Sequence, residues 1–159
     1  MPIEASLARA LPATVGDHRP SHRPGERRHE PAQARRVLVV DDNRDAADTL
    51  CTLLRAMGAD ARATYDGPTA LAIIRAERPH TVLLDLGMPG MDGYEVARLV
   101  RSDGELRNIS LVALTGWGQD EDRRRSREAG FDMHLVKPAA HDELRNLLSA
   151  SPAAASTGA

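Results

Sequence analysis

Five short segments along the middle of the chain are apolar or alternate between apolar and polar residues. They are residues 37–40, 60–65, 81–85, 109–114 and 133–136. Each interval between them has room for a helix, and this alternation is typical of βα units. Strands that are apolar throughout are covered on both faces. The pattern therefore predicts an α/β fold: a doubly wound five-stranded parallel sheet with five helices.

Several intervals carry helix signals of their own. The first has apolar residues at helical spacing and a terminal glycine: Ala47, Leu50, Leu54, Met57 and Gly58. The third begins with Asp92 as N-cap and Glu95 three residues later, a variant of the capping box. Ala140, before the last helix, lacks the side-chain oxygen of a good N-cap.

The fourth interval, QDEDRRRSREAG at residues 119–130, has almost no apolar stripe. Its acidic residues come first and its arginines later, which suits the dipole of a helix. Two interpretations remain open for it. It is either an ordinary solvated surface helix or a weakly anchored element that can shift.

The two ends of the chain differ from the middle. Residues 1–35 are rich in Pro and Arg and have little to bury, so we expect a disordered tail there, and a second one at residues 150–159. Residues 36–149 form the expected folded domain. Three histidines in the first tail fit a solvated segment better than a metal site: His18, His22 and His29.

Charge and composition narrow the function. Residues 1–36 contain seven Arg and four acidic residues, whereas residues 37–159 contain fourteen basic and nineteen acidic residues. The folded part is therefore acidic, which predicts no nucleic-acid partner. Cys51 is the only cysteine, as expected in a reducing compartment. No segment is long and apolar enough for a membrane span or a signal peptide, so we expect a cytoplasmic protein without a membrane partner.

Polar residues follow four of the predicted strands. Asp41 and Asp42 follow the first, Asp85 ends the third, Thr115 follows the fourth, and Lys137 follows the fifth. Parallel strands place their carboxyl ends at one edge of a sheet, where ligands bind in this class of fold. Taken singly, these residues have ordinary explanations, such as an Asp that caps the next helix. Together they predict one site.

The chemistry of this set indicates phosphoryl transfer. Neighbouring carboxylates repel one another unless a cation intervenes, and oxygen ligands suit Mg²⁺. Lys137 is the only lysine beside twenty arginines, and its compact ammonium suits a tight anion site. A carboxylate beside Mg²⁺ and Lys can attack phosphorus and become an aspartyl phosphate.

Four motifs in order resemble a response-regulator receiver domain of two-component signalling, of the CheY-like kind. They are VLVVDDN, LLDLGMPGMDGYEVAR, ALTG and HLVKP, within about residues 36–149. The resemblance implies a flavodoxin-like (βα)5 fold and an Asp85 phosphoacceptor. It also implies a metal site of Asp41, Asp42, Asp85 and the main-chain carbonyl of Gly87, a switch hydroxyl on Thr115, and a phosphate-binding Lys137 followed by cis Pro138.

Three positions modify this expectation. The family often carries Tyr or Phe where this chain has His134, which replaces an aromatic gate with a titratable switch residue, or merely fills a strand position. In this family the positions of Gly87 and Trp117 lie close to the phosphoryl group. Gly87 cannot orient water and Trp117 can obstruct it, so we expect slow hydrolysis, unless Trp117 points into solvent.

The resemblance implies a donor with a phosphohistidine, either a sensor histidine kinase or a histidine phosphotransfer protein. We expect a single-domain regulator that signals through protein contacts to a downstream target, since neither tail has the composition of an output domain. The alternatives are a phosphorelay receiver detached from a hybrid histidine kinase, an interaction module that takes no phosphate, and a haloacid-dehalogenase-type phosphatase. The phosphatase needs a second acid where Gly87 stands. We therefore expect no enzyme beyond the chain's own phosphorylation and dephosphorylation.

Overall fold

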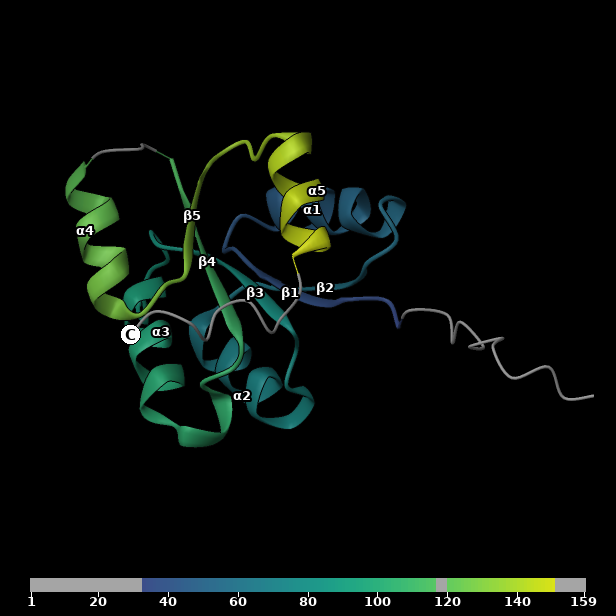
Figure 1. Ribbon diagram of the computed structural model, residues 1–159. Coiled ribbons are helices and arrows are strands. Elements are labelled where there is room, and N and C mark those ends of the chain that lie inside the picture. The colour runs from purple at the N-terminus through teal and green to yellow at the C-terminus, as the bar shows by residue number, and fades with distance from the viewer. Residues whose placement is uncertain (1–32, 117–119, 151–159) are drawn as a thin grey trace, which may run out of the picture. The chain divides into compact units, whose positions relative to one another are not determined.

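Strands and helices alternate throughout the computed structural model, which describes residues 33–116 and 120–150 (Figure 1). The elements are β1 (Arg36–Val40), α1 (Arg44–Ala56), β2 (Asp60–Thr64), α2 (Gly67–Glu77), β3 (Thr81–Asp85), α3 (Gly93–Ser102), the 3₁₀ turn η1 (Gly104–Leu106), β4 (Ser110–Thr115), α4 (Asp120–Ala129), β5 (Met133–Val136) and α5 (His141–Ser149). Apart from residues 33–35 and 150, the expected tails lie outside the described residues, as do the three histidines and Trp117.

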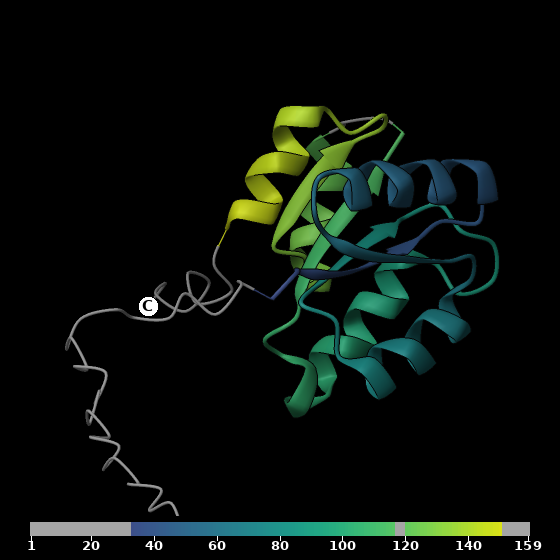
Figure 2. The same ribbon diagram turned by 90° about the vertical axis from the view of Figure 1, so that its right-hand side faces the viewer.

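All five strands form one parallel sheet in the order β2-β1-β3-β4-β5. Helices α1 and α5 cover one face, and α2, α3 and α4 cover the other (Figures 1 and 2). The predicted fold class is confirmed. The strand that was expected to end at residue 114 includes Thr115, because Thr115 still pairs with Val136 of β5.

Alternation along the central strands builds the two halves of the core. In β1 and β3, Val39 and Leu83 face the helices α1 and α5, whereas Val40 and Leu84 face α2 and α3. Every residue of β3 is buried, including Asp85 at its end. A side chain placed at the carboxyl end of β1 or β3 is therefore held by a rigid, fully packed strand.

Helix caps decide which polar side chains remain available at the strand ends. Asn43 caps α1 by accepting a hydrogen bond from the Ala46 N–H at 3.1 Å, so this cap uses neither the Asp41 nor the Asp42 carboxylate. Asp92 caps α3 by accepting from the Glu95 N–H, as predicted. The cap of α5 lacks a side-chain acceptor at Ala140, also as predicted.

Helix α4 buries the smallest side chains of the helices that the structure describes. Its buried residues are Ser126 and Ala129, both small. Since apolar burial supplies most of the stability of a surface helix, α4 resists displacement less than its neighbours do. Within residues 33–116 and 120–150, no helix is long and apolar enough to cross a membrane.

Gly93 lets α3 begin directly against the end of β3. A Cβ atom at this position would lie 2.3 Å from the carbonyl oxygen of Asp85 and 3.0 Å from the Cα of Leu86. Both are backbone atoms that cannot turn aside. Because Gly93 has no side chain, α3 can begin this close to the strand that carries Asp85.

We predict that Gly93→Ala lowers the free energy of unfolding by about 1–3 kcal/mol, because the added methyl group forces backbone apart. Urea denaturation measures the loss. Gly104→Ala is the matched control, since a Cβ at Gly104 meets nothing within 4 Å. Equal stability of the two variants would contradict the close approach at Gly93.

Candidate functional site

Five polar side chains converge at the carboxyl edge of the sheet. Asp41 and Asp42 follow β1, Asp85 ends β3, Thr115 ends β4, and Lys137 follows β5. These four strands are consecutive in the sheet and parallel, so their ends lie side by side. The structure brings together the whole set that the strand-end argument predicted, from segments far apart in the sequence.

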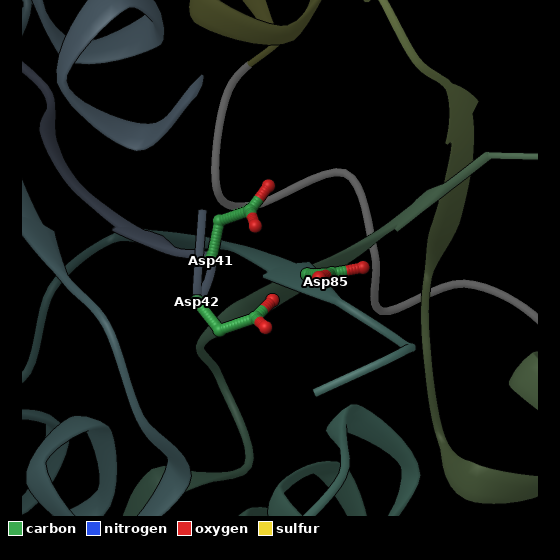
Figure 3. A group of neighbouring side chains, drawn as sticks. All are labelled: Asp41, Asp42 and Asp85. Atoms are coloured by element: carbon green, nitrogen blue, oxygen red, sulfur yellow. The ribbon is translucent and has the colours of Figure 1, made fainter. Parts of the chain in front are cut away.

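Three carboxylates form the centre of the site. One oxygen each from Asp41, Asp42 and Asp85 lies within 4.8 Å of the others, and Figure 3 shows the three side chains on the adjoining ends of β1 and β3. Asp41 and Asp85 are buried, whereas Asp42 is exposed, which leaves one side of the group open to water. Charged oxygen donors with access for water suit Mg²⁺.

The Lys137 ammonium joins two of these carboxylates. Its Nζ lies 2.7 Å from Asp41 Oδ2 and 3.2 Å from Asp85 Oδ1. Burial lowers the pKa of Lys137, but the hydrogen bond to Asp41 and the charges of Asp85 and Asp41 raise the pKa above its ordinary value. Lys137 is therefore a fixed positive charge at neutral pH.

The Asp85 carboxyl is compensated only in part. Burial is the strongest influence and raises its pKa, whereas the Gly87 N–H, which donates to Asp85 Oδ1 at 3.2 Å, and the charge of Lys137 lower the pKa. The charge of Asp41 raises it again, and the net result is a pKa above the ordinary value. A further cation beside Asp85 would stabilise its charged form.

Thr115 lies in a hydrogen-bonded chain that leads away from the carboxylates. Its Oγ1 is 3.0 Å from His134 Nε2, and His134 Nδ1 is 3.4 Å from Ser126 Oγ on α4. Ser126 donates its own proton to the Arg123 carbonyl, so it accepts from Nδ1–H and leaves Nε2 to accept from Thr115. This assignment holds for the neutral imidazole, in which Nε2 carries no proton.

The protonation of His134 follows its surroundings. Burial is the main cause that lowers its pKa, and the charge of Arg123 lowers it further, against an opposing influence of Asp122. His134 thus contacts Thr115 of β4 and Ser126 of α4.

Reasoning from the sequence missed four residues around Asp85. Gly93 sets the backbone spacing, and three further side chains share a pocket with Asp85: Tyr94, Asp122 and Arg125. The motif containing Gly93 was visible in the sequence. The last two belong to the polar run of α4, whose rotation about its own axis no apolar stripe could predict.

The comparisons with known proteins agree with this geometry. Residues 37–149 match the family model described as response regulator receiver domain. The DNA-binding response regulator MtrA of Mycolicibacterium paratuberculosis is 39% identical over 109 residues, which cover 69% of this chain and 47% of that protein. The matched part of this chain therefore spans about half the length of that relative.

The name of this relative corrects one prediction. The acidic balance of residues 37–159 led to the expectation that nucleic acid is not a partner, and a relative named for DNA binding contradicts it. The expectation was wrong because the net charge of a receiver domain carries no information about DNA contacts made by the rest of a longer regulator.

Two solved structures share the fold. Chemotaxis protein CheY4 of Vibrio cholerae has a TM-score of 0.68 and 27% identity, covering 72% of this chain and 96% of that one. The receiver domain of sensor histidine kinase PA1611 from Pseudomonas aeruginosa, with a magnesium ion coordinated in its active-site cleft, has a TM-score of 0.67 and 29% identity, covering 72% and 94%. With a family model that matches residues 37–149, this chain belongs to the response regulator receiver domain family.

Proposed function

We propose that this receiver accepts a phosphoryl group on Asp85 from a phosphohistidine donor in a Mg²⁺-dependent reaction. The donor is a sensor histidine kinase or a histidine phosphotransfer protein. The observation that carries the proposal is the Lys137 ammonium, which lies within 3.2 Å of both Asp41 and Asp85 inside a group of three carboxylates. Lone ion pairs do not need a third acid beside them, whereas a metal and phosphoryl site does.

The transfer uses the Asp85 carboxylate as nucleophile. Its oxygen attacks phosphorus, the P–N bond to the donor imidazole breaks, and the electron pair of that bond stays on the imidazole nitrogen. An acyl phosphate forms on Asp85. Lys137 is placed to pair with a phosphoryl oxygen while Asp41 keeps its ammonium oriented, since the Asp41 contact is the shorter of the two.

The residues that would hold Mg²⁺ are Asp41, Asp42, Asp85 and the main-chain carbonyl of Gly87. When bound, the ion neutralises charge on the carboxylates and the phosphoryl oxygens. The acidic group and its open side at Asp42 support this assignment. The chain itself contributes a preorganised set of donors, so that positioning and charge neutralisation carry most of the reaction.

We assign the switch to Thr115 and His134. Before phosphorylation, the Thr115 hydroxyl is used by His134 Nε2. A phosphoryl oxygen on Asp85 competes for the same hydroxyl proton, and Thr115 then leaves His134 without its donor. Because His134 also contacts Ser126, this change reaches α4, the least anchored helix.

The output and the address of the whole protein belong to the same proposal. A downstream protein target is one recipient of the signal. DNA binding by an associated effector is a second output, suggested by the name of the MtrA relative. Asp85 phosphorylation and dephosphorylation are the only chemistry we assign, without turnover of an external substrate. A cytoplasmic address accords with the single, buried Cys51.

A phosphorelay receiver that belongs to a hybrid histidine kinase is the second candidate. The similarity to the receiver domain of a sensor histidine kinase favours it. The phosphatase reading has no such support, because Gly87 occupies the position of the required general acid.

We predict that acetyl phosphate with Mg²⁺ adds a single phosphoryl group to the purified chain, since the small donor needs only the receiver's own site. Intact-mass spectrometry measures the added mass, and borohydride reduction followed by peptide mapping locates it at Asp85. Chelation of Mg²⁺ should abolish the modification.

Asp85→Asn is the control for this experiment, because it removes the nucleophile and keeps the shape. Equal labelling of Asp85→Asn and the parent would refute the assignment. Steady hydrolysis of a phosphomonoester by the parent would instead support the phosphatase.

We predict that acid destabilises the fold through His134. An unfolded histidine has a pKa of about 6.5, and the folded pKa lies below this value because of burial. The unfolded chain therefore binds the proton more readily, so stability is complete above about pH 6.5 and is lost as the pH falls below it. Urea denaturation across this range measures the loss.

His134→Phe should remove part of this pH dependence, because it cannot titrate. His80 has a pKa that burial also lowers, so a second variant, His80→Gln, separates its share. A pH dependence that is identical in His134→Phe and the parent would show that His134 does not contribute.

A further inference from the structure

A pocket of 250 Å³ opens beside Asp85 on the side of α3 and α4. The strand ends contribute Asp85 and Thr115, and the helices contribute Tyr94 from α3 with Asp122 and Arg125 from α4. Lys137 does not line this pocket; it lines a different one on the side of α1. Among the residues that line this pocket, Arg125 is thus the one cationic side chain.

Arg125 is held loosely in its present position. Its guanidinium carbon lies 4.5 Å from the centroid of the Tyr94 ring. The Tyr94 hydroxyl donates to Asp122 Oδ1 at 3.5 Å, a long hydrogen bond. A cation stacked on a ring near solvent is weakly stabilised, so a stronger anion nearby can draw it away.

We infer that Arg125 is a second phosphoryl-binding cation, which leaves the Tyr94 ring and binds an oxygen of the phosphoryl group on Asp85. The inference rests on the proposed function. A phosphoryl group carries about 1.5 to 2 negative charges at neutral pH, whereas the Asp85 carboxylate that it replaces carries one, so the site becomes more negative. Lys137 already contacts two carboxylates, and the planar guanidinium fork matches phosphoryl oxygens better than a second ammonium would.

The same helix carries a group of opposite charge. Asp122 precedes Arg125 by three residues, so the two lie on the same face of α4. A phosphoryl group attracts Arg125 and repels Asp122. The two forces act at points one turn apart, so they favour a rotation or tilt of α4 that brings Arg125 closer to Asp85 and moves Asp122 away. Since α4 buries only Ser126 and Ala129, little packing opposes that movement.

The test uses beryllofluoride, a phosphoryl mimic, with Mg²⁺ and the full chain. Calorimetric titration should show that Arg125→Ala binds the mimic roughly tenfold more weakly than the parent, as expected for the loss of a charged hydrogen bond. Arg125→Lys should fall between the two, because it keeps the charge and loses the fork. In the parent, the mimic should change hydrogen exchange within residues 120–129, and Arg125→Ala should reduce that change.

Arg124→Ala is the matched control, because it removes the same charge from the same helix. Arg124 pairs with Glu121 and Glu128 on the solvent side and does not line the pocket. Its affinity for the mimic should equal that of the parent. Equal affinities of Arg125→Ala, Arg124→Ala and the parent would overturn the role of Arg125 and leave the proposed function intact, whereas a parent that binds no mimic would overturn both.

Discussion

Crowded negative charge at the carboxyl ends of β1 and β3 is the constraint on which the rest of this structure depends. Asp41 and Asp85 are buried, and Asp42 completes a group whose oxygens lie within 4.8 Å of one another. Lys137 compensates part of this charge, yet the pKa of Asp85 stays above its ordinary value. The fold thus holds a site that gains stability when further positive charge enters it.

The rigid strands hold the carboxylates in place, whereas the loosely held helix α4 can move. Packed strands fix the carboxylates, and Gly93 fixes α3 against Asp85. Helix α4 buries little, and it contacts the surroundings of the site twice. Ser126 reaches Thr115 through His134, and Arg125 shares a pocket with Asp85. A charge change on one strand end therefore acts on the element that resists it least.

The alternation of apolar runs predicted the strands to within one residue and placed five polar side chains at one edge. Parallel topology alone brings Asp41, Asp85 and Lys137 together, so this part of the site follows from the sequence pattern. The stacking of Arg125 on Tyr94 could not be predicted, because it depends on side-chain rotamers and on the rotation of a helix without an apolar stripe. The charge argument against nucleic acid failed because it concerned only the receiver.

The central claim is that the three carboxylates form a Mg²⁺ site, and the free energy of unfolding tests it most directly. Urea denaturation is measured without divalent ions and with MgCl₂ at about a hundred times the dissociation constant, at equal ionic strength. Mass action predicts that Mg²⁺ stabilises the parent by about 2.7 kcal/mol. Asp42→Asn, which lacks one carboxylate, should gain much less at the same concentration. A parent that gains nothing, or a variant that gains as much as the parent, would contradict the site.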